Sequence, residues 1–570
     1  MIGGVSLTNN LYIKALLNDK GQNMKEPIDI KKITFDELKQ LFQKRIFAIP
    51  EIQREFVWTK IKIIDLLDSI KKHYPIGSFL ICKVPSKMAK HIRESAVLPK
   101  FDSKNNKECY IVVDGQQRLS VLYSIINGKK ISDTRRYYDG IDFMQICISP
   151  KQDKESEFDF YRIDENSHIK LFDILNDRVR YRLGKGKEKR VKSCLNAFKT
   201  YSFPFIFISG YDEKSMRQAF IRLNKGGTSL SSEDKIFAMS YHKDTDLRKH
   251  CAQLLHDLKG GFDSFERIHF IKAIAYDLGI KDFIGSTSLN TFAKKVMNPR
   301  DKLHIEYKKQ HKKIFESIKL SADFLIQRIK HASYIPYPAM LSILSIFYYY
   351  NGNRQPTEKQ INQIEKWFWV TGFTKRYSGG NQRYNQMNDA EEMKKLAKSK
   401  KYTINLEGKT KVEPLSMEEL AKIKYNKFGA IRNAFFCYLI SKKPLNFING
   451  EPLPIGEVSS LFNAKNDHHV FPKDILKDYF YRDDINTILN ICFLTFGENI
   501  KIKNKAPWIY LKEFTTNSNF KKVLESHVLP FKDCLLKKGE IYNKFTSFKK
   551  ERLNLIKEDL TKLMGEKYIG

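Results

Sequence analysis

One short stretch, residues 111–120 (IVVDGQQRLS), constrains the fold of this chain more than any other. It completes an apolar run that begins at Cys109, breaks at Asp114-Gly115 and leads at once into a helical pattern with a stop signal at Gly128. A buried strand that passes straight into a helix is typical of an α/β domain. The polar residues DGQQR are therefore expected at a strand-to-helix junction.

The chemistry of this junction has two interpretations. Backbone N–H groups at the start of a helix, together with the helix dipole, favour an anion. Gly115 lets the backbone approach a ligand closely, and Arg118 in the first turn can offer two parallel N–H groups to a phosphate. On these residues alone, an ordinary helix start capped by Asp114 fits equally well.

The charge of the chain favours one class of partner, nucleic acid. With 100 Lys and Arg against 65 Asp and Glu, the formal net charge is +35, and an excess of this size is typical of proteins that bind nucleic acid. A lysine-rich composition of the source genome is the alternative. At 570 residues the chain is too long for a single core, so about two to four domains are expected.

Cysteines and apolar runs indicate the compartment. The eight cysteines show no CxxC spacing and several lie in apolar runs, which favours reduced core residues over a disulfide framework or a zinc site. The N-terminus lacks the pattern of a signal peptide. The most apolar window, residues 335–350, contains Pro336 and Pro338 and is too short to span a bilayer. We expect a cytoplasmic protein with no membrane partner.

The first of three parts, residues 1–245, alternates strands and helices. A helix is expected over 61–73, and a basic stretch at 178–192 is expected to be a solvated loop, with contact to a DNA backbone as the sharper alternative. The expected strands are 47–50, 75–84, 109–114, 142–149 and 203–209.

The other two parts differ in texture. Residues 246–425 have an almost wholly helical pattern and include a Gly-rich basic loop at 374–386, which is a surface linker or a nucleic-acid contact. Residues 426–570 begin with a helix over 428–440 and end in Lys-rich helices.

Three motifs in the last part carry the residues of a hydrolytic site. The first, at 444–456, is a hairpin around an Asn-Gly pair. The second, NDHHVFPKDIL at 466–476, ends a strand in two histidines. The third, at 489–507, is expected to place Asn490 on a second strand and Asn499 at the start of a final element.

These side chains suit phosphodiester hydrolysis. A neutral imidazole at His469 can deprotonate water for attack on phosphorus, and Asn490 can hold that imidazole. His468 and Asn499 offer ligands for one divalent ion, which would stabilise the leaving oxygen. The ordered set Asp, His, His, Pro, Asn and Asn resembles the HNH (ββα-metal) nuclease motif. Alignment on its HxxP core favours this assignment, whereas a one-residue slip would make His468 the base and Asp467 the ligand.

The DGQQR segment has two companions elsewhere in the first part. Gln53 and Arg54 follow a strand end fixed by proline, and Arg222 and Asn224 precede a Gly-Gly turn. Each alone could be a cap, a surface pair or a turn. Together the three polar loops are what a pocket for a charged ligand needs.

At this point the chain resembles a GmrSD-type, modification-dependent restriction endonuclease. The motifs IPxxQRxxxW, DGQQR and FxxLNxxGxxLxxxE of that group occur at 49–58, 114–118 and 220–233. The resemblance implies a multidomain α+β protein: a ParB/sulfiredoxin-like nucleotide-binding α/β domain over 1–245, a helical linker or sensor region over 246–425, and an HNH endonuclease domain with C-terminal helices over 426–570.

The resemblance also implies an activity. Such enzymes hydrolyse a nucleoside triphosphate at the DGQQR pocket and use Mg²⁺ or Mn²⁺ to cut modified phage DNA at the HNH site. Asp114 would orient the attacking water or the metal, and Arg118 and Arg54 would hold phosphates. The residues implied to complete the nucleotide site are Gln53, Gly115, Gln116, Gln117, Arg222 and Asn224. The pair His468-His469 stands where many HNH enzymes have Asp-His, which puts the choice of metal in doubt.

Two other functions fit the same residues. One is a ParB-like DNA-binding or regulatory NTPase whose HNH unit is structural, and the other is a nuclease toxin that acts on the host. DNA and a nucleoside triphosphate are the expected partners, and a homo-oligomer is left open. The sequence does not specify the DNA mark, the nucleotide base, or whether nucleotide hydrolysis drives or restrains cleavage.

Overall fold

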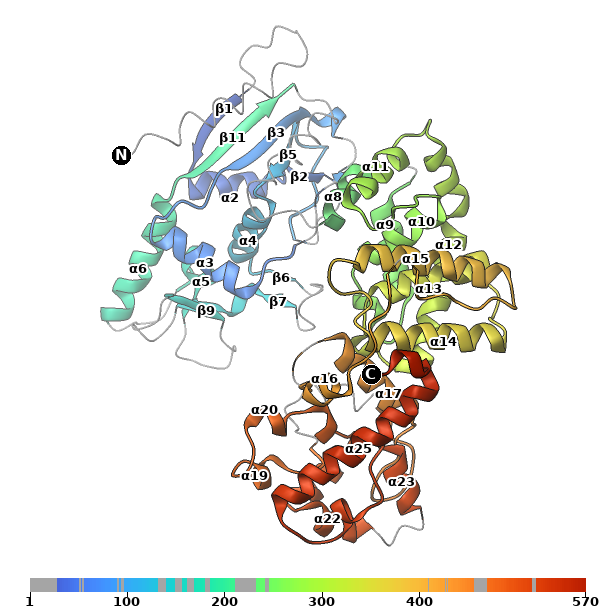
Figure 1. The fold of residues 1–570 in the computed structure, drawn as a ribbon. Helices are drawn as coiled ribbons and strands as arrows, with labels where there is room; N and C mark the ends of the chain where they lie inside the picture. Colours follow the sequence, from blue (N-terminus) through green and yellow to red (C-terminus); the bar gives the residue numbers. More distant parts are fainter. Residues whose placement is uncertain are drawn as a thin grey trace, which may run out of the picture. The chain divides into compact units, whose positions relative to one another are not determined.

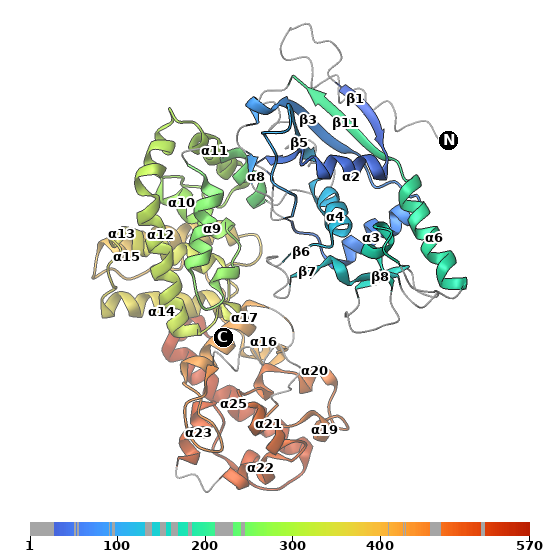
Figure 2. The same cartoon turned by 180° about the vertical axis from the view of Figure 1, so that it is seen from behind.

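The structure of the chain is a computed structural model that divides into two compact units, Met1–Met239 (unit 1) and Ser240–Gly570 (unit 2) (Figures 1 and 2). Each unit is described by itself. The described residues are 28–50, 53, 56–89, 92–93, 97–131, 140–148, 156–160, 169–179, 185–210, 232–240, 245–408, 410–425, 427, 429–455, 469–514 and 519–570. The expected three-part division of the chain stays a prediction.

Unit 1 is built on a mixed six-stranded sheet. Its order is β1 (Ile28–Ile33), β11 (Phe203–Ser209), β3 (Phe79–Pro85), β5 (Glu108–Asp114), β2 (Phe47–Pro50) and β4 (Ile92–Arg93). The pairs β11–β3 and β2–β5 are parallel and the other pairs are antiparallel. The expected strands at 47–50, 109–114 and 203–209 are confirmed. The strand expected from residue 75 begins only at Phe79, because Gly77 has a positive φ of 80°.

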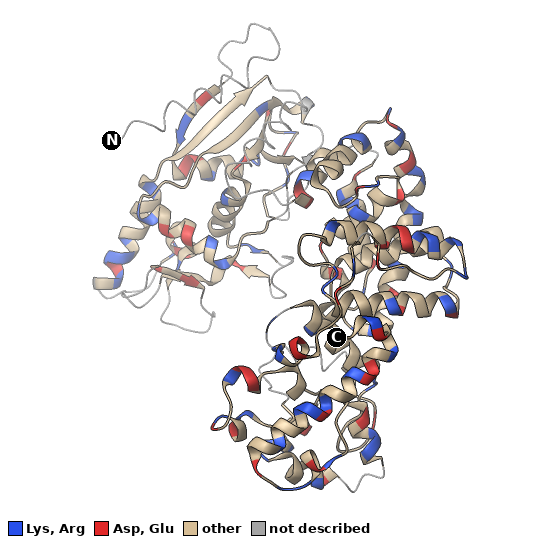
Figure 3. Cartoon of the chain, in the orientation of Figure 1, with Lys and Arg blue, Asp and Glu red and all other residues tan. Residues whose placement is uncertain are grey.

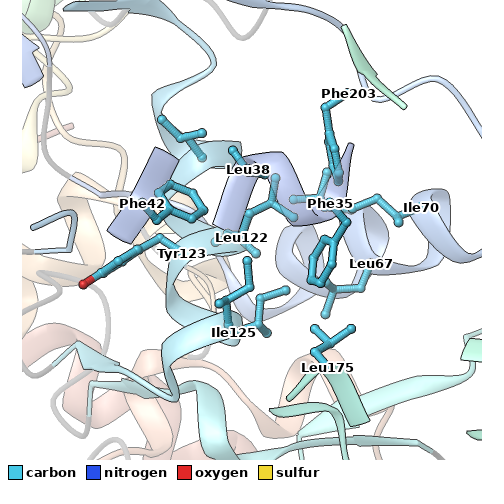
Figure 4. Packing of buried hydrophobic residues seen from close by; sticks show 14 of the residues in the cluster. Phe35, Leu38, Phe42, Leu67, Ile70, Leu122, Tyr123, Ile125, Leu175 and Phe203 are labelled. Carbon is cyan, nitrogen blue, oxygen red and sulfur yellow. The ribbon is translucent and has the colours of Figure 1, made fainter. Parts of the chain in front are cut away.

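Helices cover this sheet with their apolar sides. In Figure 4, side chains of α2 (Phe35–Gln43), α3 (Lys60–Lys71) and α4 (Gln116–Asn127) meet in one core. The other elements of unit 1 are α5 (Leu171–Leu175), α6 (Lys185–Thr200), α8 (Ser232–Ser240), a sheet of β8 (Ile146–Ile148), β9 (Phe158–Phe160) and β10 (Ile169–Lys170), a pair β6 (Lys130–Ile131) and β7 (Ile141–Asp142), and the 3₁₀ turns η1 (Ser86–Met88) and η2 (Phe143–Gln145).

The basic stretch at 178–192 is not the loop that its charge suggested. Helix α6 begins inside it at Lys185. Its later turns bury Cys194 and Phe198, and Glu188 pairs with Lys192 one turn apart at 2.7 Å. Burial of one face therefore outweighs the repulsion of the clustered lysines.

Unit 2 is helical, as the pattern over 246–425 predicted. Its first helices are α9 (Leu247–Asp257), α10 (Ile268–Asp277), α11 (Ser286–Met297), α12 (Lys302–Ile329), α13 (Ala339–Tyr350), α14 (Glu358–Phe373), α15 (Gln382–Lys398), α16 (Met417–Lys422) and α17 (Ala430–Ser441), with 3₁₀ turns η3 (Phe262–Ser264) and η4 (Ala332–Tyr334). The apolar window at 335–350 is the buried helix α13. Within the described ranges, no helix combines the length and apolar content needed to cross a bilayer.

The end of unit 2 has a core of its own. It gathers apolar residues between 447 and 548 and includes Phe447, Phe471 and Tyr510. Its elements are α19 (Lys473–Leu476), α20 (Arg482–Ile485), η5 (Ile488–Asn490), α21 (Phe496–Ile502), α22 (Pro507–Phe514), α23 (Phe520–Ser526), α24 (Asp533–Leu536), α25 (Ile541–Met564) and η6 (Glu566–Tyr568). All eight cysteines of the chain are buried and reduced, as expected.

Candidate functional sites

The DGQQR segment lies where the sequence predicted, at the junction between β5 and α4. Asp114 ends the strand, Gly115 is the N-cap with a left-handed φ of 91°, and the helix begins at Gln116. A Cβ at residue 115 would lie 2.7 Å from Cδ1 of Phe79. Both the backbone angle and the close neighbour therefore demand glycine.

Two glutamines tie this junction to the chain that follows β2. The Gln53 side chain is 2% exposed and donates to the carbonyl oxygens of Val112 and Val113, the latter at 3.0 Å. In return, the backbone N–H of Val57 donates to Oε1 of Gln117 at 2.9 Å. These residues satisfy backbone groups at the open end of the strand pair β2–β5, which a buried loop must do.

Arg118 is held by the protein on three sides. Its guanidinium donates to the carbonyl of Ile76, to the carbonyl of Ser78 at 3.0 Å and to the carboxylate of Asp114 at 3.0 Å. These bonds use three of the five guanidinium N–H groups. Burial lowers the pKa of Arg118, and the Asp114 charge opposes that shift. Arg118 thus fixes the chain before β3 to the start of α4, in addition to any contact with a phosphate.

The other members of the predicted pocket are only partly placed. Gln116 is 6% exposed, and its side chain forms no hydrogen bond within the described part of the chain. The Asp114 side chain is 41% exposed, so it is the carboxylate at this junction that faces solvent. Arg54, Arg222 and Asn224 lie outside the described residues.

The second candidate site surrounds His469 in unit 2. Its backbone pairs with that of Ile491 in an isolated antiparallel bridge. Its Nε2 lies 3.1 Å from Oδ1 of Asn486, and its ring meets the ring of Tyr425 edge to face at 5.3 Å between centroids. The imidazole is 3% exposed. Because Asn486 oxygen can only accept, this contact favours the tautomer that carries its proton on Nε2.

Asn490 clamps the backbone beside this histidine. Its Oδ1 accepts from the N–H of Phe471 at 2.8 Å, and its Nδ2 donates to the carbonyls of Phe471 at 3.0 Å and Ile485 at 3.1 Å. The residue is fully buried. Asn490 ends the 3₁₀ turn η5 and does not lie on the predicted second strand. Its backbone carbonyl accepts from the N–H of Val470 at 2.8 Å beside the bridge of His469 with Ile491, and its side chain holds Phe471.

Asn499 lies in the second turn of a short helix. Helix α21 begins with a capping box, in which the Thr495 side chain and the Glu498 carboxylate bond each other's backbone N–H groups. Glu498 also accepts from the N–H of Phe447 at 2.6 Å, which ties the helix to the turn at 446–451. In that turn, Leu445 and Pro452 form an antiparallel bridge around the predicted Asn-Gly pair. Asn499 is half-buried.

The predicted metal pair is not fully described. His468 and its alternative Asp467 lie outside the described residues, so their distances to Asn499 are not stated. Within the residues the structure describes, no three His, Cys, Asp or Glu side chains converge on one point.

Sequence patterns missed three residues that hold this part of unit 2 together. Asn486 contacts the His469 ring, Glu498 ties α21 to Phe447, and Arg552 bonds backbone carbonyls. The Arg552 guanidinium is fully buried and donates to the carbonyls of Leu489 at 2.7 Å, His527 at 3.0 Å and Val528 at 3.1 Å. In the sequence, Arg552 is one basic residue among many in a Lys-rich helix, a pattern typical of a solvated face. Asn486 likewise stands in no motif that would have pointed to it.

Comparison with known proteins bears on both units. An uncharacterized protein of Methanocaldococcus jannaschii is 23% identical over 599 residues, an alignment that covers 94% of this chain and 99% of that protein. The similarity therefore runs through unit 2 as well as unit 1. Residues 38–241 match the family model of the GmrSD restriction endonuclease N-terminal domain, a match that contains β2, the DGQQR junction and β11. This match supports a GmrSD-type relationship, and with it a restriction endonuclease family that acts on DNA.

Proposed function

We propose that this protein is a nucleotide-regulated, divalent-metal-dependent DNA endonuclease that cleaves modified or foreign DNA, including phage DNA, in bacterial defence. The observation that carries the proposal is the pairing of the family match over residues 38–241 with a clamped histidine loop in unit 2. The excess of basic residues fits a nucleic-acid substrate. The HNH assignment is part of this proposal.

His469 is the residue that we assign as general base. With the Nε2 proton donated to Asn486, the lone pair on Nδ1 can accept a proton from a water molecule that attacks phosphorus. Asn490 acts indirectly. Its side chain fixes the backbone of Phe471, two residues after the histidine, and so positions His469. The ring is 3% exposed, so water must reach an atom that its surroundings almost enclose.

A weakly held divalent ion fits the donor set of this site. Magnesium prefers oxygen ligands and keeps several waters when it is bound to one or two protein groups plus a phosphate. The half-buried Asn499 supplies such an oxygen, and a cage of three acidic or imidazole ligands is absent among the described residues. Asn499, together with His468, would hold the ion, which supplies charge stabilisation to the leaving oxygen.

The DGQQR junction is proposed as the nucleotide site that controls cleavage. The positive end of α4, the glycine at its cap and the solvent-facing Asp114 suit a bound triphosphate. Because Arg118 already bonds Asp114 and two carbonyls, a phosphate would add to or exchange with these partners.

The test is DNA nicking by a His469→Ala variant. Loss of a general base lowers the cleavage rate by about 100- to 10,000-fold, and triphosphate hydrolysis by unit 1 should survive. Removal of divalent ions by a chelator should stop cleavage, and added Mg²⁺ or Mn²⁺ should restore it. Modified and unmodified phage DNA, each with and without triphosphate, identify the mark and the role of the nucleotide.

Two further variants distinguish loss of catalysis from loss of folding. His469→Gln keeps a donor for Asn486 but removes the titratable ring, so it should fold and still fail to cleave. His256→Ala removes an imidazole that is 86% exposed in the same unit and should change neither property. Nicking that survives in both His469 variants would refute the assignment.

A second candidate function is favoured by the burial of His469. A regulatory NTPase that binds DNA through a ParB-like domain would keep the HNH unit as a structural element, and a base enclosed to 3% exposure fits that role. This candidate predicts triphosphate hydrolysis stimulated by DNA and no strand breaks at any divalent-ion concentration. A nuclease toxin, the third alternative, would arrest growth on expression without phage.

A further inference from the structure

A cationic pocket lies beside the His469 site in unit 2. It has a volume of about 370 Å³ and is lined by three segments that are distant in sequence. Five of its side chains are basic and two are hydroxyl-bearing, and none is acidic: Lys375, Lys422, Lys424, Lys427 and Arg432, with Tyr337 and Ser378. We name this feature the lysine pocket. A cavity of this size accommodates a small ligand or part of a polymer.

The charge of the lysine pocket is only partly compensated. Lys375 pairs with Glu419 at 2.8 Å and Lys424 pairs with Asp483, and in each pair at least one side chain is more than half exposed. Lys422 and Lys427 form no ion pair within the described residues and are exposed. Exposed pairs of this kind contribute little, so an anion can displace them.

Helix α17 adds to this charge. Its first residues, Gly429 to Arg432, line the lysine pocket, and its N-cap Gly429 has no side chain to satisfy the free N–H groups. The positive end of the helix dipole therefore faces the same space as the lysines.

A buried network shapes the wall made by residues 374–381; the loop predicted over 374–386 is shorter in the structure, because α15 begins at Gln382. Arg376 donates to both carboxylate oxygens of Asp389, and Tyr377 and Trp367 donate to the same carboxylate at 2.7 and 2.9 Å. All four side chains are buried. The residues on either side of this anchor, Lys375 and Ser378, reach the lysine pocket, and the Ser378 hydroxyl bonds that of Tyr337 at 2.8 Å.

The opposite wall, which includes Lys424, belongs to the same segment as Tyr425, a residue that contacts His469. Lys424 pairs with Thr487 in a β-bridge, and the N–H of Tyr425 donates to the carbonyl of Asn486 at 3.0 Å. Asn486 contacts the His469 ring through its side chain, and Tyr425 contacts it through its own ring. One residue, Tyr425, thus separates the lysine pocket from the proposed base.

We infer that the lysine pocket binds backbone phosphate of the DNA strand that is presented to His469. This inference rests on the nuclease function proposed above and names the surface that holds its substrate. Basic residues are spread over elements of both units (Figure 3), so net charge alone did not single out this place. The lysine pocket is singled out by a cavity with only partly compensated lysines, by the N-terminus of α17 and by its place one residue away from the base. The Tyr337 ring can pack against a sugar or base next to the bound phosphate.

The experiment is a salt titration of DNA binding by the full-length chain. A fluorescent 20-base-pair duplex is titrated with parent and Lys422→Ala/Lys427→Ala protein, with chelator present so that no cleavage occurs. Loss of two phosphate contacts should weaken binding by about 10-fold at low salt and reduce the slope of log K against log salt by about two. Both lysines are exposed, so the melting temperature should not change.

The matched control is Lys400→Ala/Lys401→Ala, which removes the same charge from exposed residues outside the pocket lining. It should leave the salt slope within half a unit of the parent slope. In the presence of Mg²⁺, the pocket variant should raise KM for DNA cleavage more than it lowers kcat. A slope equal to that of the parent, or a loss of triphosphate binding with DNA affinity intact, overturns the inference.

The outcome is separable from that of the nuclease proposal. If His469→Ala protein still cleaves DNA, the base assignment is wrong whatever the salt slope shows. If His469→Ala protein is inactive while the pocket variant binds and cleaves as the parent does, only the lysine pocket is refuted.

Discussion

The DGQQR junction of unit 1 and the histidine loop of unit 2 are each stabilised by the same kind of hydrogen bond. They differ in the reactive group that each contains. In each, a buried amide side chain bonds backbone groups of a chain segment distant in sequence: Gln53 reaches β5, and Asn490 reaches Phe471. Unit 1 leaves a solvent-facing carboxylate beside a buried arginine. Unit 2 leaves an enclosed imidazole, that of His469.

The difference suggests which residues position the site and which react. Buried amides satisfy backbone groups that would otherwise cost free energy, so Gln53, Gln117 and Asn490 are positioning residues. The titratable groups, Asp114 in one loop and His469 in the other, are the candidates for chemistry. Predictions that separate stability from activity test this distinction.

The largest stability effect is expected from Asn490→Ala. The change removes three hydrogen bonds and leaves buried groups of Phe471 and Ile485 unpaired, which should lower the free energy of unfolding by about 4 kcal/mol. Chemical denaturation measures it. Asn499→Ala, at a half-buried position, should abolish cleavage with a loss below about 1 kcal/mol. Equal stabilities of the two variants would contradict the assignment of Asn490 as a positioning residue.

The next effect is a pH dependence of unit 2. Burial, with Arg552 nearby, lowers the pKa of His527 to about 4, although its Nε2 donates to the carbonyl of Leu445. The unfolded chain takes up a proton below its ordinary pKa of about 6.5, whereas the folded protein does so only near 4. Stability is therefore fully present above pH 6.5 and falls as the pH drops toward 4, by roughly 3 kcal/mol from this group.

Calorimetry of the parent and His527→Gln proteins checks this prediction. The measurements run from about pH 7.5 to about pH 4.5, because this range begins above the pKa of the unfolded chain and approaches that of the folded protein. Glutamine can keep the bond to Leu445 without titrating, so part of the acid sensitivity should disappear. His269, whose pKa burial lowers to about 3, supplies a further part in the same unit. In the described part of unit 1, His73 is exposed, so its substitution is the control. An unaltered pH profile for His527→Gln would refute the assignment.

A smaller loss is expected from Gln53→Ala. Two carbonyl oxygens at the end of β5 lose their donor, and the free energy of unfolding should fall by about 2 kcal/mol. Because Val57 stays bonded to Gln117, the junction should open only on the Gln53 side. Hydrogen exchange of amides in β5 measures this effect. Retention of parent protection at 112–114 would show that Gln53 does not hold the strand.

Sequence alone predicted the parts of these sites that depend on near neighbours. The strand, glycine and helix at 109–127 follow from local apolar spacing and the demands of a left-handed turn, and so does the bridge around Asn449-Gly450. The family match then supported the relationship inferred from the N-terminal motifs.

Contacts across long sequence separations could not be predicted in this way. Gln53 bonds a residue 59 positions away, and Arg118 bonds a carbonyl 42 positions away. No pattern in a single sequence records these pairs. The apolar flanks of Asn490 predict a strand, but the residue ends a 3₁₀ turn and its side chain bonds the backbone of Phe471. The roles of the motif members that lie outside the described residues, including Arg54 and His468, stay predictions.

The smallest structural effect, and the sharpest test of the comparison, belongs to Asp114→Asn. The asparagine keeps an oxygen that can accept from Arg118, and the carboxylate is 41% exposed, so the loss of charge should cost less than about 1 kcal/mol. If Asp114 orients water or a metal at a bound triphosphate, hydrolysis should nevertheless fall by about 100-fold or more. Arg118→Gln is the matched change on the other partner, and it should destabilise the protein more because it also frees the carbonyls of Ile76 and Ser78. Thermal melting and phosphate release, measured on both variants, separate the two roles. A stable Asp114→Asn protein with full hydrolysis would make the junction a structural turn, which is the alternative that its five residues left open.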